Sequence, residues 1–161
     1  MLATASQSLL DVTVVANNLS FGNKTHGMSI GTEIDNTDGG LGDNFIVANN
    51  ISINNALLGI REREGVGPNN QFVNNIVYGN GKAVFGEEDY EWPSAAESTD
   101  QGIIMQNVQF VQFQADGSGN YRLQSNSPAI DAGIAISILS TDFDGRPRPQ
   151  GKGIDIGPFE S

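Results

Sequence analysis

The chain has 161 residues, and its 19 acidic and 8 basic side chains give a formal net charge of −11 at pH 7. This charge argues against a nucleic-acid partner, because phosphate backbones are bound by lysine and arginine. Cysteine is absent, which excludes a disulfide framework, a zinc–thiolate site and a thiol nucleophile. No apolar run reaches the roughly 18 residues of a membrane span, and the first residues lack the basic and apolar regions of a signal peptide.

Length and composition predict one domain, over residues 1–161, that is nearly all β. Apolar residues make up 38% of the chain and charged residues 17%. The 20 glycines, together with many asparagines, interrupt almost every stretch long enough for a helix. The apolar residues are largely Val, Ile, Leu and Phe, which favour strands joined by tight turns.

An asparagine-centred phrase recurs: VANNLSFGN at 15–23, VANNISINN at 47–55, FVNNIVYGN at 72–80 and a degenerate MQNVQFVQF at 105–113. Spacings of 32, 25 and 32 residues separate the asparagines that we align, Asn18, Asn50, Asn75 and Asn107. Repeats of this length are typical of solenoids, whose units stack on their neighbours. At the strand spacing of about 4.8 Å, equivalent asparagines are expected to form a hydrogen-bonded ladder.

Two strands are predicted in each coil, with coils over about 11–42, 43–68, 69–102 and 103–119. Alternation at period two places one set of apolar side chains in the coil interior. From the first strand this set is Val12, Val14, Leu19, Phe21, Ile51, Ile53, Ile76, Tyr78, Val108 and Phe110. From the second strand it is Met28, Ile30, Leu58, Ile60, Ala83 and Phe85.

A charged line is predicted on the outer face of the second strands. Aligning Ile30, Ile60 and Phe85 places Glu33, Arg63 and Glu88 in register as an acid–base–acid ladder. Arg61 and Glu62 then lie beside this line, opposite Gly31 and Thr32. Such a surface suits a shallow sugar-binding groove, whereas the alternative is that opposite charges on neighbouring strands simply offset each other.

Other candidate residues lie in the turns. His26, the only histidine, begins a second strand, and Lys24 shares its turn, so both are candidates for acid–base work or for structural stacking. Tyr90 and Trp92 in the acidic EEDYEWP segment could pack against a sugar ring or cover the core. The oxygen-rich loop with Asp35, Asp38 and Asp43 is a candidate Ca²⁺ site, although it matches no established calcium motif.

The C-terminal phrases NYRLQSNSPAIDAG (120–133) and TDFDGRPRPQGKGIDIGPFES (141–161) resemble a recurrent ending of right-handed parallel β-helix proteins of the pectate-lyase-like superfamily. Pro158 stands where this ending usually has alanine. The resemblance implies a right-handed parallel β-helix of about four to five coils, closed by a C-terminal cap at 120–161. We expect this cap to cover the last coil, with Arg146 and Arg148 paired to Asp142, Asp144 or Asp155. The alternative is that these residues bind a substrate or a cation.

The resemblance also implies a secreted or cell-surface protein associated with carbohydrate. Members of this family are usually several hundred residues long, and their catalytic residues lie in earlier coils, so the chain resembles the C-terminal part of one. Whether it is catalytic stays open. One hypothesis is a lyase-like module acting on acidic polysaccharide, and the other is a non-catalytic structural, adhesion or assembly module. Unless the first residues, MLATASQSLL, cap the first coil, its strand edges further predict self-association, for example as a head-to-head dimer.

Overall fold

The computed structural model describes residues 12–31, 43–62, 69–81 and 99–161, and all regular structure in these ranges is β. No helix in them is long and apolar enough to cross a membrane. Eight strands belong to the stacked coils up to residue 81: β1 (Thr13–Ala16), β2 (Leu19–Phe21), β3 (Met28–Ile30), β4 (Phe45–Ala48), β5 (Ile51–Ile53), β6 (Ile60–Glu62), β7 (Gln71–Val73) and β8 (Ile76–Tyr78). Three follow: β9 (Thr99–Gln101), β10 (Phe110–Gln112) and β11 (Asn120–Leu123).

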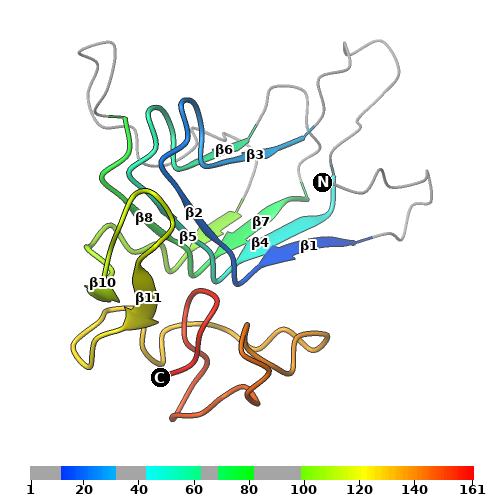
Figure 1. Cartoon of the computed structure of the whole chain (residues 1–161). Coiled ribbons are helices and arrows are strands. Elements are labelled where there is room, and N and C mark those ends of the chain that lie inside the picture. The colour runs from blue at the N-terminus through cyan, green and yellow to red at the C-terminus, as the bar shows by residue number, and fades with distance from the viewer. Residues whose placement is uncertain (1–11, 32–42, 63–68, 82–98) are drawn as a thin grey trace, which may run out of the picture.

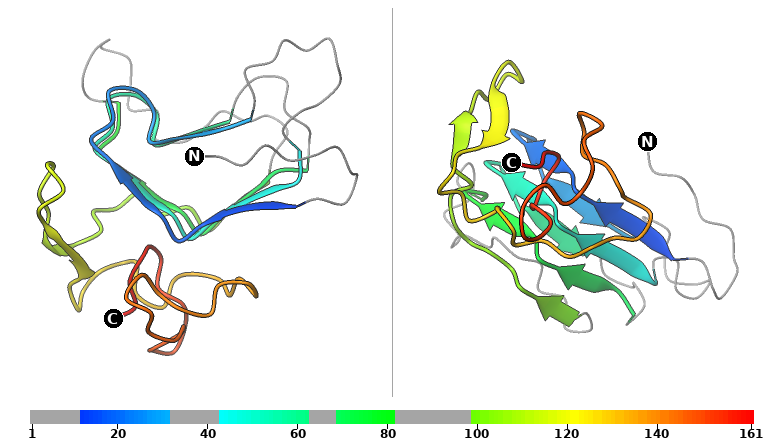
Figure 2. Two further views of the ribbon diagram at one scale, coloured as in Figure 1. Left: turned by 45° about the vertical axis from the view of Figure 1, so that its right-hand side comes forward. Right: turned by 90° about the horizontal axis from the view of Figure 1, so that it is seen from below.

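The strands of successive coils form parallel stacks. The orders are β1-β4-β7-β9, β2-β5-β8 and β3-β6, and every neighbouring pair in these stacks is parallel. Viewed along the stack, the described coils superimpose, with β1, β2 and β3 on successive sides of one coil (Figures 1 and 2). The predicted all-β fold of stacked parallel coils is therefore confirmed.

The asparagine pairs form the corner between the first and second stacks. The first member of each pair has a positive φ, at 57° for Asn17, 55° for Asn49 and 50° for Asn74. Asparagine tolerates this left-handed region better than other residues that carry a Cβ. In the next coil Gly102 has a φ of 63°. The corner therefore needs Asn or Gly at this place.

The second asparagine of each pair builds the predicted ladder. Asn50 Oδ1 accepts the backbone N–H and the Nδ2 of Asn18, both at 3.0 Å. Asn75 Oδ1 accepts the same groups of Asn50, at 2.9 and 3.0 Å. A second ladder, which was not predicted, joins Asn23, Asn55 and Asn80 at the next corner by the same pair of bonds.

Asn107 does not belong to the ladder, so its predicted equivalence is wrong. Gln71 pairs with Thr99, and Ile76 bridges Ile104, which places Ile103 rather than Asn107 opposite Asn75. Asn107 is exposed, and its Oδ1 accepts the N–H of Gln109 at 2.9 Å. The strand predicted around Val108 and Phe110 is instead part of the antiparallel pair β10–β11. The fourth coil therefore lacks the asparagine that would extend the ladder.

Two apolar clusters lie on opposite faces of the second stack. The interior cluster contains Val47, Phe72 and Val77, together with Met28, Ile30 and Ile60 from the third side, which were predicted to lie there. The second cluster lies outside the coils and joins strand residues such as Ile51 and Ile76 to residues after 107, including Val108, Ala129 and Ile156. The prediction that the following residues line the interior is therefore wrong: Leu19, Phe21, Ile51, Ile53, Ile76, Tyr78, Val108 and Phe110.

The reason for this inversion is the corner itself. A left-handed residue between two strands turns the chain, so the alternation of the first strand does not continue in phase into the second. Val15 therefore faces the interior, so the predictions for its neighbour Val14 and for Val12, which is 56% exposed, are wrong. On β5 the inward side chain is Ser52, whose Oγ donates to the Gly59 carbonyl at 2.7 Å.

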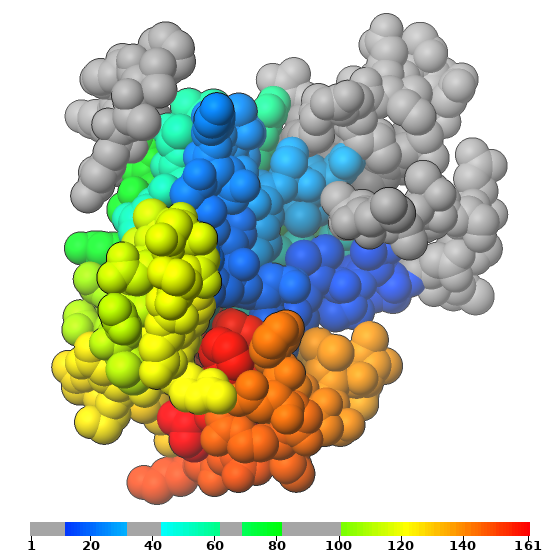
Figure 3. Space-filling view, in the orientation of Figure 1, coloured from blue at the N-terminus to red at the C-terminus, as the bar shows by residue number. Residues whose placement is uncertain are grey.

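The C-terminal segment packs along the flank of the stack (Figures 2 and 3). It contacts the corner residues of three coils: Asn17 Nδ2 donates to the Gly157 carbonyl, Asn49 Nδ2 to the Ile134 carbonyl, and Asn74 Nδ2 to the Ala132 carbonyl. This differs from the predicted cap on the last coil. The segment packs on the flank because its partners lie there, namely the outward-pointing amides and the outer apolar face of β5 and β8.

Candidate ligand-binding surface

Ser29 and Arg61 lie side by side on the outer face of the third stack. Met28 pairs with Ile60 and Ser29 pairs with Arg61 in the parallel register of β3 and β6. Because Met28, Ile30 and Ile60 point into the interior cluster, the alternate residues Ser29 and Arg61 point outward.

This register corrects the predicted charged line. Ile30 lies opposite Glu62 rather than Ile60, and Arg61 lies opposite Ser29 rather than Gly31. A shift of two residues leaves the same side chains inward, so apolar alternation could not detect the error. The 32-residue offset of the asparagine ladder would have fixed it, since this offset relates Met28 to Ile60.

His26 contacts the next coil at both ring nitrogens. Nδ1 accepts the Leu58 N–H at 3.2 Å, and Nε2 lies 3.3 Å from Arg61 Nη1. A neutral imidazole has one acceptor nitrogen, so the bond from Leu58 places the proton on Nε2. A guanidinium only donates. In this tautomer Nε2–H and Nη1 are both donors, and the positive charge of Arg61 beside His26 suits an anionic acceptor.

Ser29 adds a third polar group, beneath this surface. Its Oγ is buried and makes no hydrogen bond. A buried hydroxyl without a partner is unfavourable by about 1–3 kcal/mol, so such a group in a native structure calls for an explanation. We define the Ser29–His26–Arg61 cluster as these three residues. Its chemistry suits a carboxylate, which can accept several hydrogen bonds at once.

The other residues predicted for this surface are mostly not brought into it. Lys24 is exposed in the turn between β2 and β3. The backbone of Glu62 lies opposite Ile30, at the end of β6. The remaining predicted binding and catalytic residues, Glu33, Arg63, Glu88, Tyr90 and Trp92, lie outside the described residues.

Asp43 makes a structural contact. Its two carboxylate oxygens accept the backbone N–H of Asn69 at 2.8 Å and the Asn69 Nδ2 at 2.7 Å. Partial burial raises the pKa of this carboxyl, but the hydrogen bonds from Asn69 outweigh burial and leave the pKa below its ordinary value. Its predicted calcium partners, Asp35 and Asp38, lie outside the described residues, and within the described ranges no group of three acidic or histidine side chains could hold a metal.

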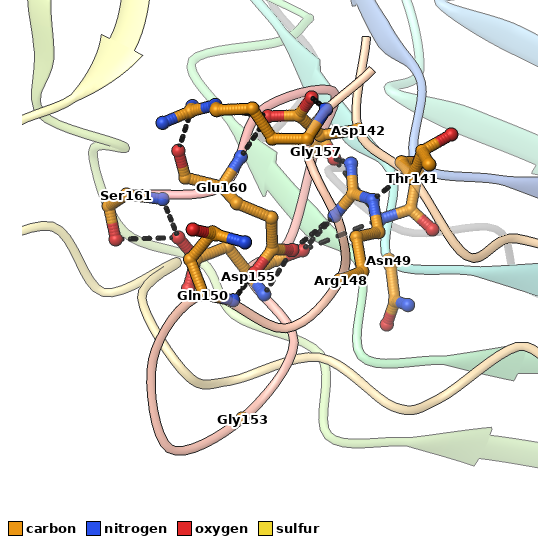
Figure 4. Close-up of polar contacts among 12 residues, drawn as sticks. Asn49, Thr141, Asp142, Arg148, Gln150, Gly153, Asp155, Gly157, Glu160 and Ser161 are labelled. Atoms are coloured by element: carbon orange, nitrogen blue, oxygen red, sulfur yellow. Dashed lines mark hydrogen bonds and ion pairs between the residues drawn. The ribbon is translucent and has the colours of Figure 1, made fainter. Parts of the chain in front are cut away.

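A second polar cluster locks the C-terminal segment (Figure 4). Arg148 Nη1 donates to Glu160 Oε1 at 2.5 Å, with side chains 2% and 0% exposed. The guanidinium also donates to the carbonyls of Thr141, Asp155 and Gly157. Glu160 further accepts the N–H groups of Gln150 and Asp155, both at 3.1 Å. Because these groups already have partners, we assign the cluster a structural role.

The predicted pairing of the two arginines is correct for one of them. Arg146 forms an ion pair with Asp142 at 3.1 Å, as expected. Arg148 pairs with Glu160, which the sequence analysis did not consider, and it contacts Asp155 only at the main-chain carbonyl. The signal for Glu160 was its place in the final DIGPFE phrase.

Comparison with known proteins gives a weak structural likeness. No protein-family model and no curated protein matches the chain. Among solved structures, the crystal structure of pectate lyase Pel9A is similar at a TM-score of 0.31 and 12% sequence identity, over 91% of this chain. The chain spans 65% of that protein's length. A likeness at this level carries no argument about function, so the inferences below depend on the residues themselves.

Proposed function

We propose that the chain is a right-handed parallel β-helix module of a secreted or cell-surface protein, and that it binds acidic polysaccharide at the Ser29–His26–Arg61 cluster. The observation that carries this proposal is the 3.3 Å contact of Arg61 Nη1 with His26 Nε2, together with Ser29, which pairs with Arg61 in the strand register and whose hydroxyl makes no hydrogen bond. The resemblance of the C-terminal phrases to β-helix proteins supports the fold and the class of ligand.

A uronate carboxylate fits this cluster in charge and in hydrogen bonding. Its oxygens can accept hydrogen bonds from the Arg61 guanidinium, and bonds to a charged donor stabilise by about 1.5–3 kcal/mol. The net charge of −11 opposes approach of a polyanion. Salt screens this repulsion beyond a Debye length of about 8 Å at 0.15 M, whereas the contact itself is shorter. We therefore expect affinity to change little, or to increase, as salt rises from low to physiological concentration.

The test is binding of oligogalacturonate and oligoalginate by isothermal titration calorimetry, with a neutral galactan as the control ligand. Arg61→Gln should weaken binding of the acidic ligands by about tenfold or more. Lys152→Gln makes the same change in net charge at an exposed residue of the C-terminal segment and should leave affinity within about twofold. Equal losses in the two variants would show that net charge, and not this cluster, determines binding.

Lyase activity is a separate proposal, which adds a catalytic step to the binding of polysaccharide. Eliminative cleavage needs a base close to the proton beside the carboxylate and a cation to neutralise that carboxylate. Arg61 can supply the cationic part, with Arg63 or Lys24 as base candidates. The unsaturated uronate product absorbs in the ultraviolet, so incubation with the same acidic polysaccharides, with and without Ca²⁺, tests it. Binding without product would indicate a non-catalytic module.

A structural or assembly module is the second candidate. The two ladders and the buried Arg148–Glu160 pair show that many polar groups of the described coils serve stability. Absence of binding to every glycan tested, by a protein that unfolds cooperatively, would favour this function.

A further inference from the structure

The two asparagine ladders have the same polarity at every step. In each, the coil nearer the N-terminus donates a backbone N–H and an Nδ2, and the following coil accepts both at one Oδ1. The distances lie between 2.8 and 3.1 Å. Each ladder Oδ1 therefore points toward the preceding coil.

In the first coil, both ladders end on side-chain oxygens, which are hydrogen-bond acceptors. Asn18 and Asn23 are exposed, whereas their equivalents Asn50 and Asn55 are 0% and 2% exposed. Both donate to the second coil, but no contact in the described part of the chain uses their Oδ1 atoms. Figure 3 shows the first coil, in blue, with its atoms toward the viewer.

The strands at this edge also lack the residues that usually prevent pairing with another strand. β1, β2 and β3 are the terminal strands of their sheets, and their sequences TVVA, LSF and MSI contain no charge and no proline. Natural edge strands that avoid pairing usually carry charges, prolines or bulges. This edge has the features of one that pairs.

We propose that the N-terminal edge of the stack is a docking surface for one further coil with the pattern Asn-Asn-x-x-x-(Gly or Asn)-Asn. The incoming coil lies parallel to β1, β2 and β3. Its two ladder asparagines donate their N–H and Nδ2 groups to Asn18 Oδ1 and Asn23 Oδ1. This inference does not depend on glycan binding.

A second copy of this chain does not fit the edge. In the expected head-to-head dimer, the Oδ1 acceptors of one copy would face the Oδ1 acceptors of the other. In a head-to-tail arrangement the fourth coil would present Ile103, which has no side-chain donor. The polarity of the ladder therefore selects an asparagine-bearing coil rather than a second copy.

The test supplies such a coil within the full chain. A copy of residues 45–69 is inserted between Val12 and Thr13, which keeps the register because Thr13 pairs with Phe45. A matched insert has aspartate in place of its copies of Asn50 and Asn55. We expect the asparagine insert to slow hydrogen exchange of its own two ladder amides by about tenfold or more relative to the aspartate insert, together with a higher melting temperature.

Two results would overturn the proposal. One is equal exchange rates in the asparagine and aspartate inserts, in proteins whose β4–β5 amides stay protected and which are therefore folded. The other concerns the unmodified chain and needs no insert: light scattering that shows a dimer, with crosslinks joining β1 of one copy to β1 of the other, would mean that the edge accepts a head-to-head copy. A monomer at the same concentration agrees with the proposal.

Discussion

Asn49 and Ile134 lie 85 residues apart in the sequence and exchange two hydrogen bonds. Asn49 Nδ2 donates to the Ile134 carbonyl at 2.7 Å, and the Ile134 N–H donates to Asn49 Oδ1 at 2.9 Å. Asn49 is fully buried and has a φ of 55°. One residue therefore turns the chain at the coil corner and holds the C-terminal segment on the flank.

Replacing Asn49 separates these two roles. Asn49→Gly keeps a residue that tolerates positive φ but removes both bonds, so we expect a loss of about 1–3 kcal/mol in the free energy of unfolding. Asn49→Ala also strains the backbone and should cost about 1–2 kcal/mol more. Urea unfolding measures both values. Equal stability of the glycine variant and the wild type would show that the bonds to Ile134 contribute nothing net.

The buried ion pair and an exposed one should differ strongly. Glu160→Gln leaves the Arg148 guanidinium, 2% exposed, without its counter-charge, and removal of one partner from a buried pair typically destabilises by about 3–5 kcal/mol. Asp144→Asn removes the partner of Arg122, whose side chain is 46% exposed, and should cost at most about 1 kcal/mol. Similar losses of stability in the two variants would contradict the structural role assigned to Glu160.

The asparagine repeat was sufficient to predict the stack because its spacing is also the register. The offset of 32 residues from Asn18 to Asn50 is the offset of every strand pair between the first two coils, from Thr13–Phe45 to Met28–Ile60. Ladder bonds need equivalent atoms one strand apart, so this signal is geometric. The prediction failed at Asn107. This asparagine is not preceded by a second asparagine in the left-handed backbone conformation, so the chain forms no corner there.

The faces of the strands and the site were harder to predict. Ile51 and Ser52 alternate on β5, and apolarity alone assigns the isoleucine to the interior. It faces outward because the corner at Asn49 changes the phase of the alternation, and the C-terminal segment, with Ile156, covers it there, which local sequence cannot reveal. His26 and Arg61 were each singled out, but their contact depends on the register between β3 and β6, where alternation allowed a shift of two residues.

Position within the ladder should decide the effect of losing an asparagine. Asn75→Ala removes the Oδ1 that accepts two donors from Asn50, which is itself 0% exposed, and removes the Nδ2 bond to the Val47 carbonyl. Each buried polar group left without a partner costs about 1–3 kcal/mol, so we expect a loss of at least about 3 kcal/mol. Asn18→Ala removes the Nδ2 bonds of an exposed residue, whereas the Asn18 N–H can still donate to Asn50 Oδ1, so it should cost about 1 kcal/mol. Chemical denaturation of the two variants measures the difference, and a larger effect at Asn18 would contradict the ladder's importance to the interior.

Acid should weaken the C-terminal segment through Asp142. Burial raises the pKa of this carboxyl, but the N–H groups of Glu160 and Arg146, the Arg146 charge and the Asp144 N–H together leave the pKa below its ordinary value. A folded-state pKa below the unfolded value of about 3.9 means that ionised Asp142 stabilises the fold fully above that pH, and that this stabilisation is lost as pH falls through the folded-state pKa. Asp142→Asn should therefore be less stable than the wild type at pH 7, and the difference in unfolding free energy should shrink below about pH 4. Urea unfolding at a series of pH values measures this difference. Because the two proteins share all other carboxyls, the titration of those groups cancels when the two free energies are subtracted. If the difference stays constant down to the lowest pH at which the wild type folds, Asp142 does not carry the acid sensitivity.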